Sequence, residues 1–438
     1  MKKFRTGLVV ASTATLALSL AACSSGDSTD SSSGGATGGD AMGNTLTVWA
    51  WDPNFNIYAM QAAEKIYQKD HPDFTLDIQE VTWDDVQTKL TTLAQSQEYD
   101  QLPDIFLMQN NAFQKNVINY PDIVTDITDS GVDFSQFPAG VTAYSTIDGK
   151  NYGVPFDSGT AINAMRTDVL EQAGLTIDDF TDITWDQYET LAKQVLDKTG
   201  KPLLSGQAGS SDMILMMLQS AGASLFDDQG NPTIVDNAAL KAAITVYAQM
   251  VKDGTFSEVN SWDEYIATLV NGTAASAING IWISGSIQSA EDQSGKWAVT
   301  DLPALDGIDG ATHYSANGGS SWAVSSNADV ALAEDFLKST FAGSTELYDE
   351  ILPASGAVAN WLPAGDSAVY SEPQAFFGGQ PIYSDVLKFA AEVPANNTGA
   401  YYYEARDAVS AAITKIINGT DMDSALQEAQ DNVEFAMN

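Results

Sequence analysis

The segment from residue 45 to residue 81 places two strand patterns on either side of a helix pattern. The stretch 45–51, TLTVWAW, alternates and is rich in β-branched and aromatic residues, and 74–81, FTLDIQEV, has a similar character. Between them, YAMQAAEKIYQ at 58–68 spaces its apolar side chains along one helical face. A strand, a helix and a strand in this order predict a βαβ unit with parallel strands, so we expect an α/β fold.

Further strand and helix signals continue this pattern along the chain. The stretch 103–110, PDIFLMQN, has the continuous apolar centre of a strand in a sheet covered on both faces. Three helix starts carry Thr82, Thr184 or Ser261 followed three residues later by an acid or amide, which is the capping-box pattern. We therefore expect the acids in these motifs to have a structural role at the helix starts before any catalytic one. Two closing helices are expected near 405–416 and from about 423 almost to 438.

The length of the chain predicts more than one domain. The 394 residues from 45 to 438 exceed one ordinary hydrophobic core. The segment 150–175 contains a short apolar strand through Val154, Pro155 and Phe156, a polar stretch, and a second strand near 160–165. We expect the chain to cross between two domains here, because a proline-flanked extended segment can act as a hinge.

The first 22 residues have the features of an export signal. Lys2, Lys3 and Arg5 precede an apolar run over 7–22, which is too short for a comfortable membrane span of about 20 residues. Residues 1–22 are therefore predicted to be a signal peptide.

The only cysteine, Cys23, follows that signal directly. The sequence LAAC at 20–23 resembles the lipobox of bacterial lipoproteins, which implies that Cys23 becomes the acylated first residue of the mature protein; a chance thiol in a cleaved signal is the alternative. Residues 23–44 are rich in Ser, Gly and Asp and are expected to form a flexible tether. No disulfide is then possible within the mature chain.

The net charge of the chain limits the classes of binding partner that we expect. The chain has 19 basic and 58 acidic residues, and loss of residues 1–22 would leave 16 basic residues and a net charge of −42. Nucleic acid is not expected as a partner, because its binding depends on basic side chains that neutralise phosphates. A polycationic ligand stays open, although an acidic surface usually serves solubility.

The usual catalytic and cofactor patterns are missing from the sequence. It has two histidines, His71 and His313, too few and too isolated for a His-based zinc site or a His triad. It also lacks a G-x-S-x-G motif, a P-loop, a dinucleotide fingerprint and an EF-hand loop. We expect no metal and no cofactor. A pair of carboxylates suited to glycoside hydrolysis stays open among 58 acids.

Aromatic and amide side chains recur at expected loop positions. Aromatic faces and planar amides suit a pyranose, which offers C–H surface and hydroxyl groups. Ligands of open α/β sheets bind outside the carboxyl ends of the strands. The candidates are Trp51, Trp83, Gln109, Asn110, Asn111, Trp282, Asn317, Gly318, Gly319, Tyr401, Tyr402 and Tyr403.

In this order, the motifs resemble the extracellular solute-binding lipoproteins of ABC importers. The lipobox and tether are followed by LTVWAWDPN at 46–54, YGVPFDSGTAINAMRTDVLEQAGL at 152–175, AINGIWISGS at 277–286 and ANGGSSWAVS at 316–325. The likeness is greatest to the carbohydrate-binding branch of Gram-positive bacteria and covers essentially the whole mature chain. It implies a two-lobed, type II periplasmic-binding-protein-like α/β fold, with a mixed sheet flanked by helices in each lobe and a ligand cleft between the lobes.

The resemblance implies lobe boundaries and a set of ligand contacts. The N-terminal lobe is expected to comprise 45–155 and roughly 315–365, and the C-terminal lobe 156–314 and roughly 366–438. The implied contacts are Trp51, Asp52, Asn54, Gln109, Asn110, Asp157, Ser158, Trp282, Asn317, Gly318, Gly319 and Tyr402, to which the aromatic pattern adds Trp83.

The resemblance also implies a function. We expect a monomeric, non-catalytic receptor on the extracellular face of the cell membrane, anchored through Cys23, that delivers an oligosaccharide to an ABC permease. Gln109 and Asn110 disfavour a maltodextrin, and xylo- or arabinoxylo-oligosaccharides are slightly favoured. The alternatives are a receptor for a polyamine or peptide, a receptor for iron in which Tyr401–Tyr403 and His313 would have to converge, and a surface glycosidase.

Overall fold

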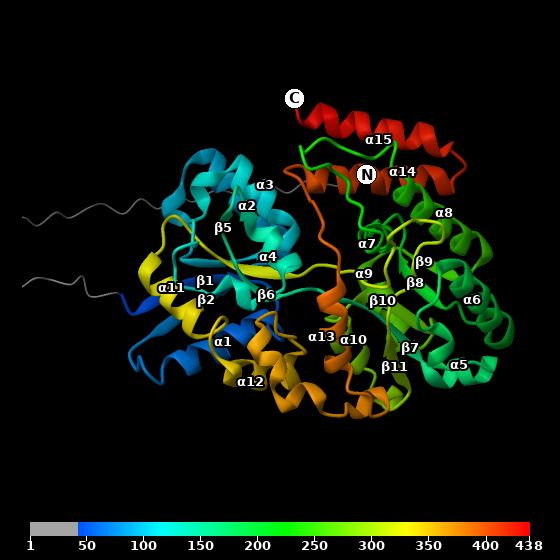
Figure 1. Ribbon diagram of the computed structural model, residues 1–438, viewed down its shortest axis with the longest axis horizontal. Helices are drawn as coiled ribbons and strands as arrows, with labels where there is room; N and C mark the ends of the chain where they lie inside the picture. The colour runs from blue at the N-terminus through cyan, green and yellow to red at the C-terminus, as the bar shows by residue number, and fades with distance from the viewer. Residues whose placement is uncertain (1–42) are drawn as a thin grey trace, which may run out of the picture. The chain divides into compact units, whose positions relative to one another are not determined.

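The computed structural model describes residues 43–438 (Figure 1). The predicted signal peptide, the lipid anchor at Cys23 and nearly all of the tether lie outside these residues. None of the helices within 43–438 combines the length and the apolar character needed to cross a membrane.

The first sheet has five strands in the order β2-β1-β3-β12-β6. Strand β1 runs parallel to both β2 and β3, while β12 runs antiparallel to β3 and β6. The predicted parallel βαβ unit is confirmed, with α1 (Asn56–Tyr67) between β1 and β2. The bounds of the strands are β1 Thr45–Ala50, β2 Thr75–Glu80, β3 Ile105–Gln109, β6 Val154–Asp157 and β12 Ser320–Val324.

Helices cover both faces of the first sheet, as the apolar centre of β3 predicts (Figure 1). Ile105 and Leu107 point into a core shared with α1, α11 and α12, whereas Phe106 and Met108 point into a core shared with α2 and α3. All four side chains are fully buried. The helices on this sheet are α2 Trp83–Ser96, α3 Phe113–Asn119, α4 Ala139–Ser145, α11 Val330–Ser339 and α12 Thr345–Ser355.

The second sheet is antiparallel, with the order β10-β7-β11. Its strands are β7 (Ala161–Arg166), β10 (Ser276–Gly280) and β11 (Trp297–Thr300). Next to it, β8 (Leu204–Gln207) and β9 (Phe256–Val259) form a parallel pair.

The remaining helices continue the chain around the second sheet. The two closing helices, α14 and α15, share a core with α5, α6, α7 and α8 (Figure 1). Residues of α13 instead share the core that includes α1 and α12. The bounds are α5 Thr167–Ala173, α6 Trp185–Thr199, α7 Asp212–Ser220, α8 Ala238–Asp253, α9 Trp262–Val270, α10 Ile283–Gln288, α13 Ile382–Glu392, α14 Tyr402–Ile417 and α15 Met422–Ala436.

The three predicted helix starts are confirmed. Thr82, Thr184 and Ser261 each accept a hydrogen bond from the backbone N–H three residues later. Only Thr184 forms the full box, in which Gln187 Oε1 also accepts from the backbone N–H of Thr184 at 2.9 Å. The acids at the other two starts bond nearby groups: Asp85 accepts from the Thr82 hydroxyl, and Glu264 accepts from the backbone N–H of Asn260.

The chain passes between the two sheets in the region that the sequence indicates. Strand β6 belongs to the first sheet and β7 to the second, so Ser158, Gly159 and Thr160 form the first crossing segment. Residues 301–319 return from β11 to β12 as the second crossing. Strand β6 continues two residues past the lobe boundary expected at 155/156.

The first and second crossings pair with each other. The backbone N–H of Asn317 donates to Gly159 O and that of Ala161 donates to Ser315 O, both at 2.8 Å. A Cβ atom on Gly159 would lie 2.4 Å from Asn317 O, and the φ of Gly159 is +59°. Glycine is therefore required at this close approach.

Candidate functional site

The loop after β1 is shaped by its own hydrogen bonds. Asn56 Oδ1 accepts from the backbone N–H groups of Trp51 at 3.1 Å and Asp52 at 3.0 Å. Asp52 Oδ1 in turn accepts from the backbone N–H of Asn54 at 2.8 Å. The side chains of Trp51 and Asp52 are half-buried and Asn54 is exposed. The loop thus presents Trp51 and Asp52 at the carboxyl end of β1.

The end of β3 contacts the start of α14. Gln109 Oε1 accepts a hydrogen bond from Tyr403 Oη at 2.8 Å. The ring of Tyr403 lies 6.0 Å from that of Trp83, and Lys115 and Arg406 approach it at 5.6 and 5.3 Å. Burial raises the pKa of the Tyr403 hydroxyl, so this group is a hydrogen-bond donor at neutral pH. Trp83 and Gln109 are therefore brought together through Tyr403.

Trp282 lies beside the second crossing. It follows β10, as predicted, and its Nε1 donates to Asn317 O at 2.9 Å. A Cβ atom on Gly318 would lie 3.4 Å from Trp282 Nε1 and 3.9 Å from Gln109 Nε2. Trp282 is half-buried, and its ring lies 5.8 Å from that of Trp262, which is 44% exposed. The predicted residues Gln109, Asn317, Gly318 and Trp282 therefore form one cluster.

A small cavity of about 20 Å³ adjoins this cluster. Its lining includes the predicted residues Asn317, Gly318 and Tyr402, together with Asp212 at the start of α7. The Asp212 side chain is exposed to solvent, yet protein atoms surround it closely enough for desolvation to raise its pKa, against the opposing effects of Arg406, Ser210 and Asn317. The analysis of the sequence missed Asp212, because one acid among 58 carries no distinguishing pattern.

Four predicted residues are buried at the crossings. The Asn110 side chain is fully buried, with its Oδ1 accepting from Ser321 Oγ at 3.0 Å, and no described residue bonds its Nδ2. The carboxylate of Asp157 accepts from the Ser320 hydroxyl, and the hydroxyls of Ser158 and Thr160 lie 2.6 Å apart. A Cβ atom on Gly319, the fourth, would lie 2.7 Å from Asn110 Nδ2.

The carboxyl group of Asp157 is electrostatically unusual. Burial raises its pKa to about 6, even though Ser320 and the backbone of Gly159 donate hydrogen bonds to the charged form. The structure gives it hydroxyl and N–H donors in place of a basic side chain. Asp157 is therefore a charge held at the junction of β6 and the first crossing.

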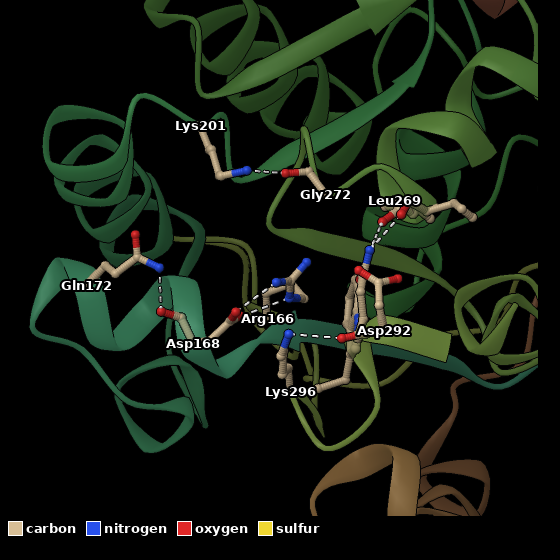
Figure 2. Close-up of polar contacts among 11 residues, drawn as sticks. Arg166, Asp168, Gln172, Lys201, Leu269, Gly272, Asp292 and Lys296 are labelled. Carbon is tan, nitrogen blue, oxygen red and sulfur yellow. Dashed lines mark hydrogen bonds and ion pairs between the residues drawn. The ribbon is translucent and has the colours of Figure 1, made fainter. Parts of the chain in front are cut away.

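A larger hollow of about 750 Å³ lies elsewhere on the second sheet and is lined by Arg166 and Lys201 (Figure 2). Figure 2 shows that Arg166 forms two bonds to the carboxylate of Asp168, at 2.8 and 2.7 Å. Lys201 donates to Gly272 O, and Lys296 donates to Asp292 O at 2.9 Å. The cations around this hollow are thus bonded within the protein, and Arg166 ends β7 at the opposite end from the crossing.

The two sheets, their paired crossings and the aromatic and amide side chains at the strand ends define a two-lobed solute-binding protein. The sequence profile of the bacterial extracellular solute-binding proteins matches residues 62–377. The chain belongs to this family, as its motifs predict.

Two relatives illustrate the range within the family. The chain is 38% identical to a lactose-binding protein of Rhizobium radiobacter over 392 residues, which cover 89% of this chain and 92% of that protein. It is 26% identical to an arabinooligosaccharide-binding protein of Halalkalibacterium halodurans, with 66% of each chain covered.

Solved structures share the fold. The galacto-N-biose/lacto-N-biose I-binding protein of Bifidobacterium longum matches with a TM-score of 0.75 at 19% identity, covering 91% of this chain and 98% of that chain. The β-1,6-galactobiose complex of a binding protein from B. animalis subsp. lactis matches with a TM-score of 0.70 at 21% identity, covering 90% and 96%. The predicted two-lobed α/β fold is confirmed.

Proposed function

We propose that this protein is a receptor that captures a short oligosaccharide between its lobes and delivers it to an ABC importer. The observation that carries the proposal is the cluster of Trp282, Gln109 and Gly318 at the second crossing. An indole face can pack on the C–H surface of a sugar ring, and amide groups can bond its hydroxyls. Gly318 allows a ligand to approach the backbone.

The small size of the cavity supports a receptor whose lobes move apart to admit the ligand. A volume of about 20 Å³ is far below the roughly 300 Å³ or more of small-molecule pockets. A disaccharide would therefore enter only after the lobes separate, and the paired crossings are suited to act as the hinge. We keep 45–155 with roughly 315–365 and 156–314 with roughly 366–438 as the proposed lobes.

The proposed contacts divide by burial. The accessible or cavity-lining candidates that would face the sugar are Trp51, Asp52, Asn54, Trp83, Gln109, Trp282, Asn317, Gly318 and Tyr402, to which we add Asp212 and Tyr403. The buried candidates Asn110, Asp157, Ser158 and Gly319 would support the crossing behind them and reach a ligand only after rearrangement.

The choice of sugar is guided by the relatives. The lactose-binding relative, matched along nearly the whole chain, favours a galactoside such as lactose over the xylo- or arabinoxylo-oligosaccharides expected from the sequence. The arabinooligosaccharide-binding relative keeps arabinan fragments as the second candidate. Titration calorimetry with lactose, arabinotriose, xylotriose and maltotriose tests this order. Absence of binding to every sugar, with binding of spermidine or a peptide instead, would overturn the proposal.

The alternative functions find little support around the cavity. Among the described residues that line it, Asp212 is the one carboxylate, whereas a polyamine needs several and a glycosidase a matched pair. His313 bonds to Leu302 O and faces Tyr314. Within residues 43–438, no hydrogen bond or ring contact joins it to Tyr401–Tyr403, which an iron site would require to converge. Release of monosaccharide on prolonged incubation of pure protein with its best-bound sugar would favour the glycosidase.

We also propose that Cys23 anchors the receptor, as a monomer, at the extracellular face of the membrane, where it can dock on permease subunits. The family is extracellular by description, and the proposal of an anchor depends on the lipobox resemblance. Cys23→Ser should move the protein from the membrane fraction of the native host to the medium without a change in sugar affinity. Retention of the variant in the membrane fraction would refute the anchor alone.

A further inference from the structure

A second cluster of polar side chains, outside the residues that line the small cavity, lies where the second crossing leaves β11. It consists of Asp182, just before α6, Asp301, just after β11, and His313, within the crossing. One potential ligand atom of each lies within 4.8 Å of those of the other two. The sequence gives no sign of this cluster, because the three residues are separated by more than a hundred positions at the widest.

The imidazole of His313 is held in one orientation. Its Nδ1 lies 2.9 Å from Leu302 O, and the backbone N–H of Leu302 donates to His313 O at 3.0 Å. A carbonyl oxygen can only accept, so Nδ1 carries the proton and the lone pair of the neutral ring is on Nε2. A backbone carbonyl on the other ring nitrogen is the usual support of a metal-ligating histidine.

Only one of the two carboxylate oxygens of Asp301 accepts hydrogen bonds from residues 43–438. The side chain is 4% exposed, and its Oδ1 accepts from the backbone N–H of Asp182 at 3.2 Å and from Thr300 Oγ1 at 3.3 Å. Within residues 43–438 no group donates a hydrogen bond to Oδ2, and neither Asp301 nor Asp182 pairs with a lysine or arginine. A buried carboxylate beside a second carboxylate needs a neutralising charge.

We propose that Asp182, Asp301 and His313 form a zinc-binding site that ties the second crossing to the start of α6. One imidazole nitrogen with two carboxylate oxygens suits Zn²⁺, whereas Ca²⁺ and Mg²⁺ prefer ligand sets made of oxygen. Ligands about 2.1 Å from one Zn²⁺ lie about 3.4 Å apart, so the side chains would move closer on binding. Asp182 is exposed, which leaves an entry path and room for a water ligand.

The test is calorimetry of the full chain carrying Cys23→Ser, so that no thiol competes for the ion. After removal of metals with a chelator, ZnCl₂ at pH 7.5 should bind at one site per chain, and 1 mM CaCl₂ or MgCl₂ should not. Asp301→Asn and His313→Gln should each weaken zinc binding at least tenfold. His71→Gln, which removes the other histidine of the chain, is the matched control and should leave it unchanged.

A melt of each variant without metal separates binding from folding. Variants that melt like the parent yet lose zinc binding support the site, and zinc should raise the melting temperature of the parent alone. The proposal is overturned if the parent binds no zinc, if zinc binding survives both substitutions, or if His71→Gln abolishes it. Binding of Ca²⁺ that does not depend on His313 would also refute the zinc assignment. Sugar binding plays no part in these measurements, so the site and the proposed function fail independently.

Discussion

The two ends of the second sheet differ in how their aspartate side chains are paired. At the crossing end, where β10 pairs Gly280 with Ala161, the nearby carboxylate of Asp157 is buried without a basic partner, and its pKa is raised to about 6. At the far end, burial of Asp168 would also raise its pKa, but the bonds and charge of Arg166 outweigh burial and lower it. At the far end, the carboxylate is paired with an arginine, whereas at the crossing end the buried carboxylate has no basic partner.

The tryptophans at the two ends differ in the same way. Trp297, at the far end, is 1% exposed, and its Nε1 donates to Gln293 Oε1 at 2.9 Å. Trp282, at the crossing end, is half-buried beside the exposed Trp262. The comparison teaches that the proposed site lies at the end where Trp282 is only half-buried, even though the far end has the larger hollow.

The substitution of Trp282 by Ala tests this comparison most strongly. If its ring supports a sugar, the loss should be about 2 kcal/mol or more of binding free energy, which is on the order of a thirtyfold rise in Kd. Titration calorimetry with the best-bound sugar gives the affinity, and a urea melt of the same variant gives the stability.

Trp297→Ala is the matched control for that experiment. Truncation of this core side chain should cost about 3–5 kcal/mol of folding stability, and a folded fraction should bind sugar with parental affinity. Unchanged affinity in Trp282→Ala, together with a stability loss as large as that of Trp297→Ala, would make both residues core and erase the difference between the two ends.

The pH dependence of stability should distinguish the two aspartates. A folded-state pKa of about 6, above the ordinary 3.8, means that the native state binds the proton more tightly than the unfolded state, so stability falls as pH rises through this window. Between pH 5 and 7.5, Asp157 should therefore cost the protein roughly 1 kcal/mol. Urea melts of Asp157→Asn should show a decline that is smaller than the parent's by about this amount.

Asp168→Asn provides the opposite comparison. The pKa of Asp168 is lowered, so its stabilising contribution is complete above the ordinary pKa and is lost only in stronger acid. Its removal should leave the slope between pH 5 and 7.5 unchanged while lowering the whole curve. Parallel curves for the parent and Asp157→Asn would contradict the burial of an unpaired charge at the crossing.

Tyr403→Phe should have the smallest effect. It removes one hydrogen bond to Gln109 and leaves the ring beside Trp83, so we expect a loss of about 1 kcal/mol or less in sugar affinity. Calorimetry should show a change of fivefold or less in Kd. Tyr401→Phe is the control and should leave the affinity unaltered; an equal loss in both variants would remove Tyr403 from the site.

Local patterns predicted much of the fold, because helix caps and strand alternation depend on near neighbours. Thr82, Thr184 and Ser261 start helices as expected, and Trp282 follows a strand. The antiparallel insertion of β12 between β3 and β6 depends on pairing across more than 150 residues, which no local pattern specifies.

The candidate site was predicted in part for the same reason. Expected loop positions pointed to Gln109 and Asn317. The start of α14, however, turns Tyr402 and Tyr403 in directions about 100° apart, so a run of three tyrosines could not show which one meets Gln109. The burial of Asp157 and the position of Asp212 depend on tertiary packing. Such residues become visible only when distant segments are brought together.

A single amide side chain connects parts of the molecule that are far apart in sequence. Gln219 Nε2 donates to Tyr144 Oη at 3.2 Å and to Pro394 O at 2.9 Å, while its Oε1 accepts from Ser315 Oγ and from the backbone N–H of Ala316, both at 3.2 Å. Every donor and acceptor of the amide is thus in use. Movement of any one of these segments away from the others breaks part of this set of hydrogen bonds, so Gln219 resists their separation.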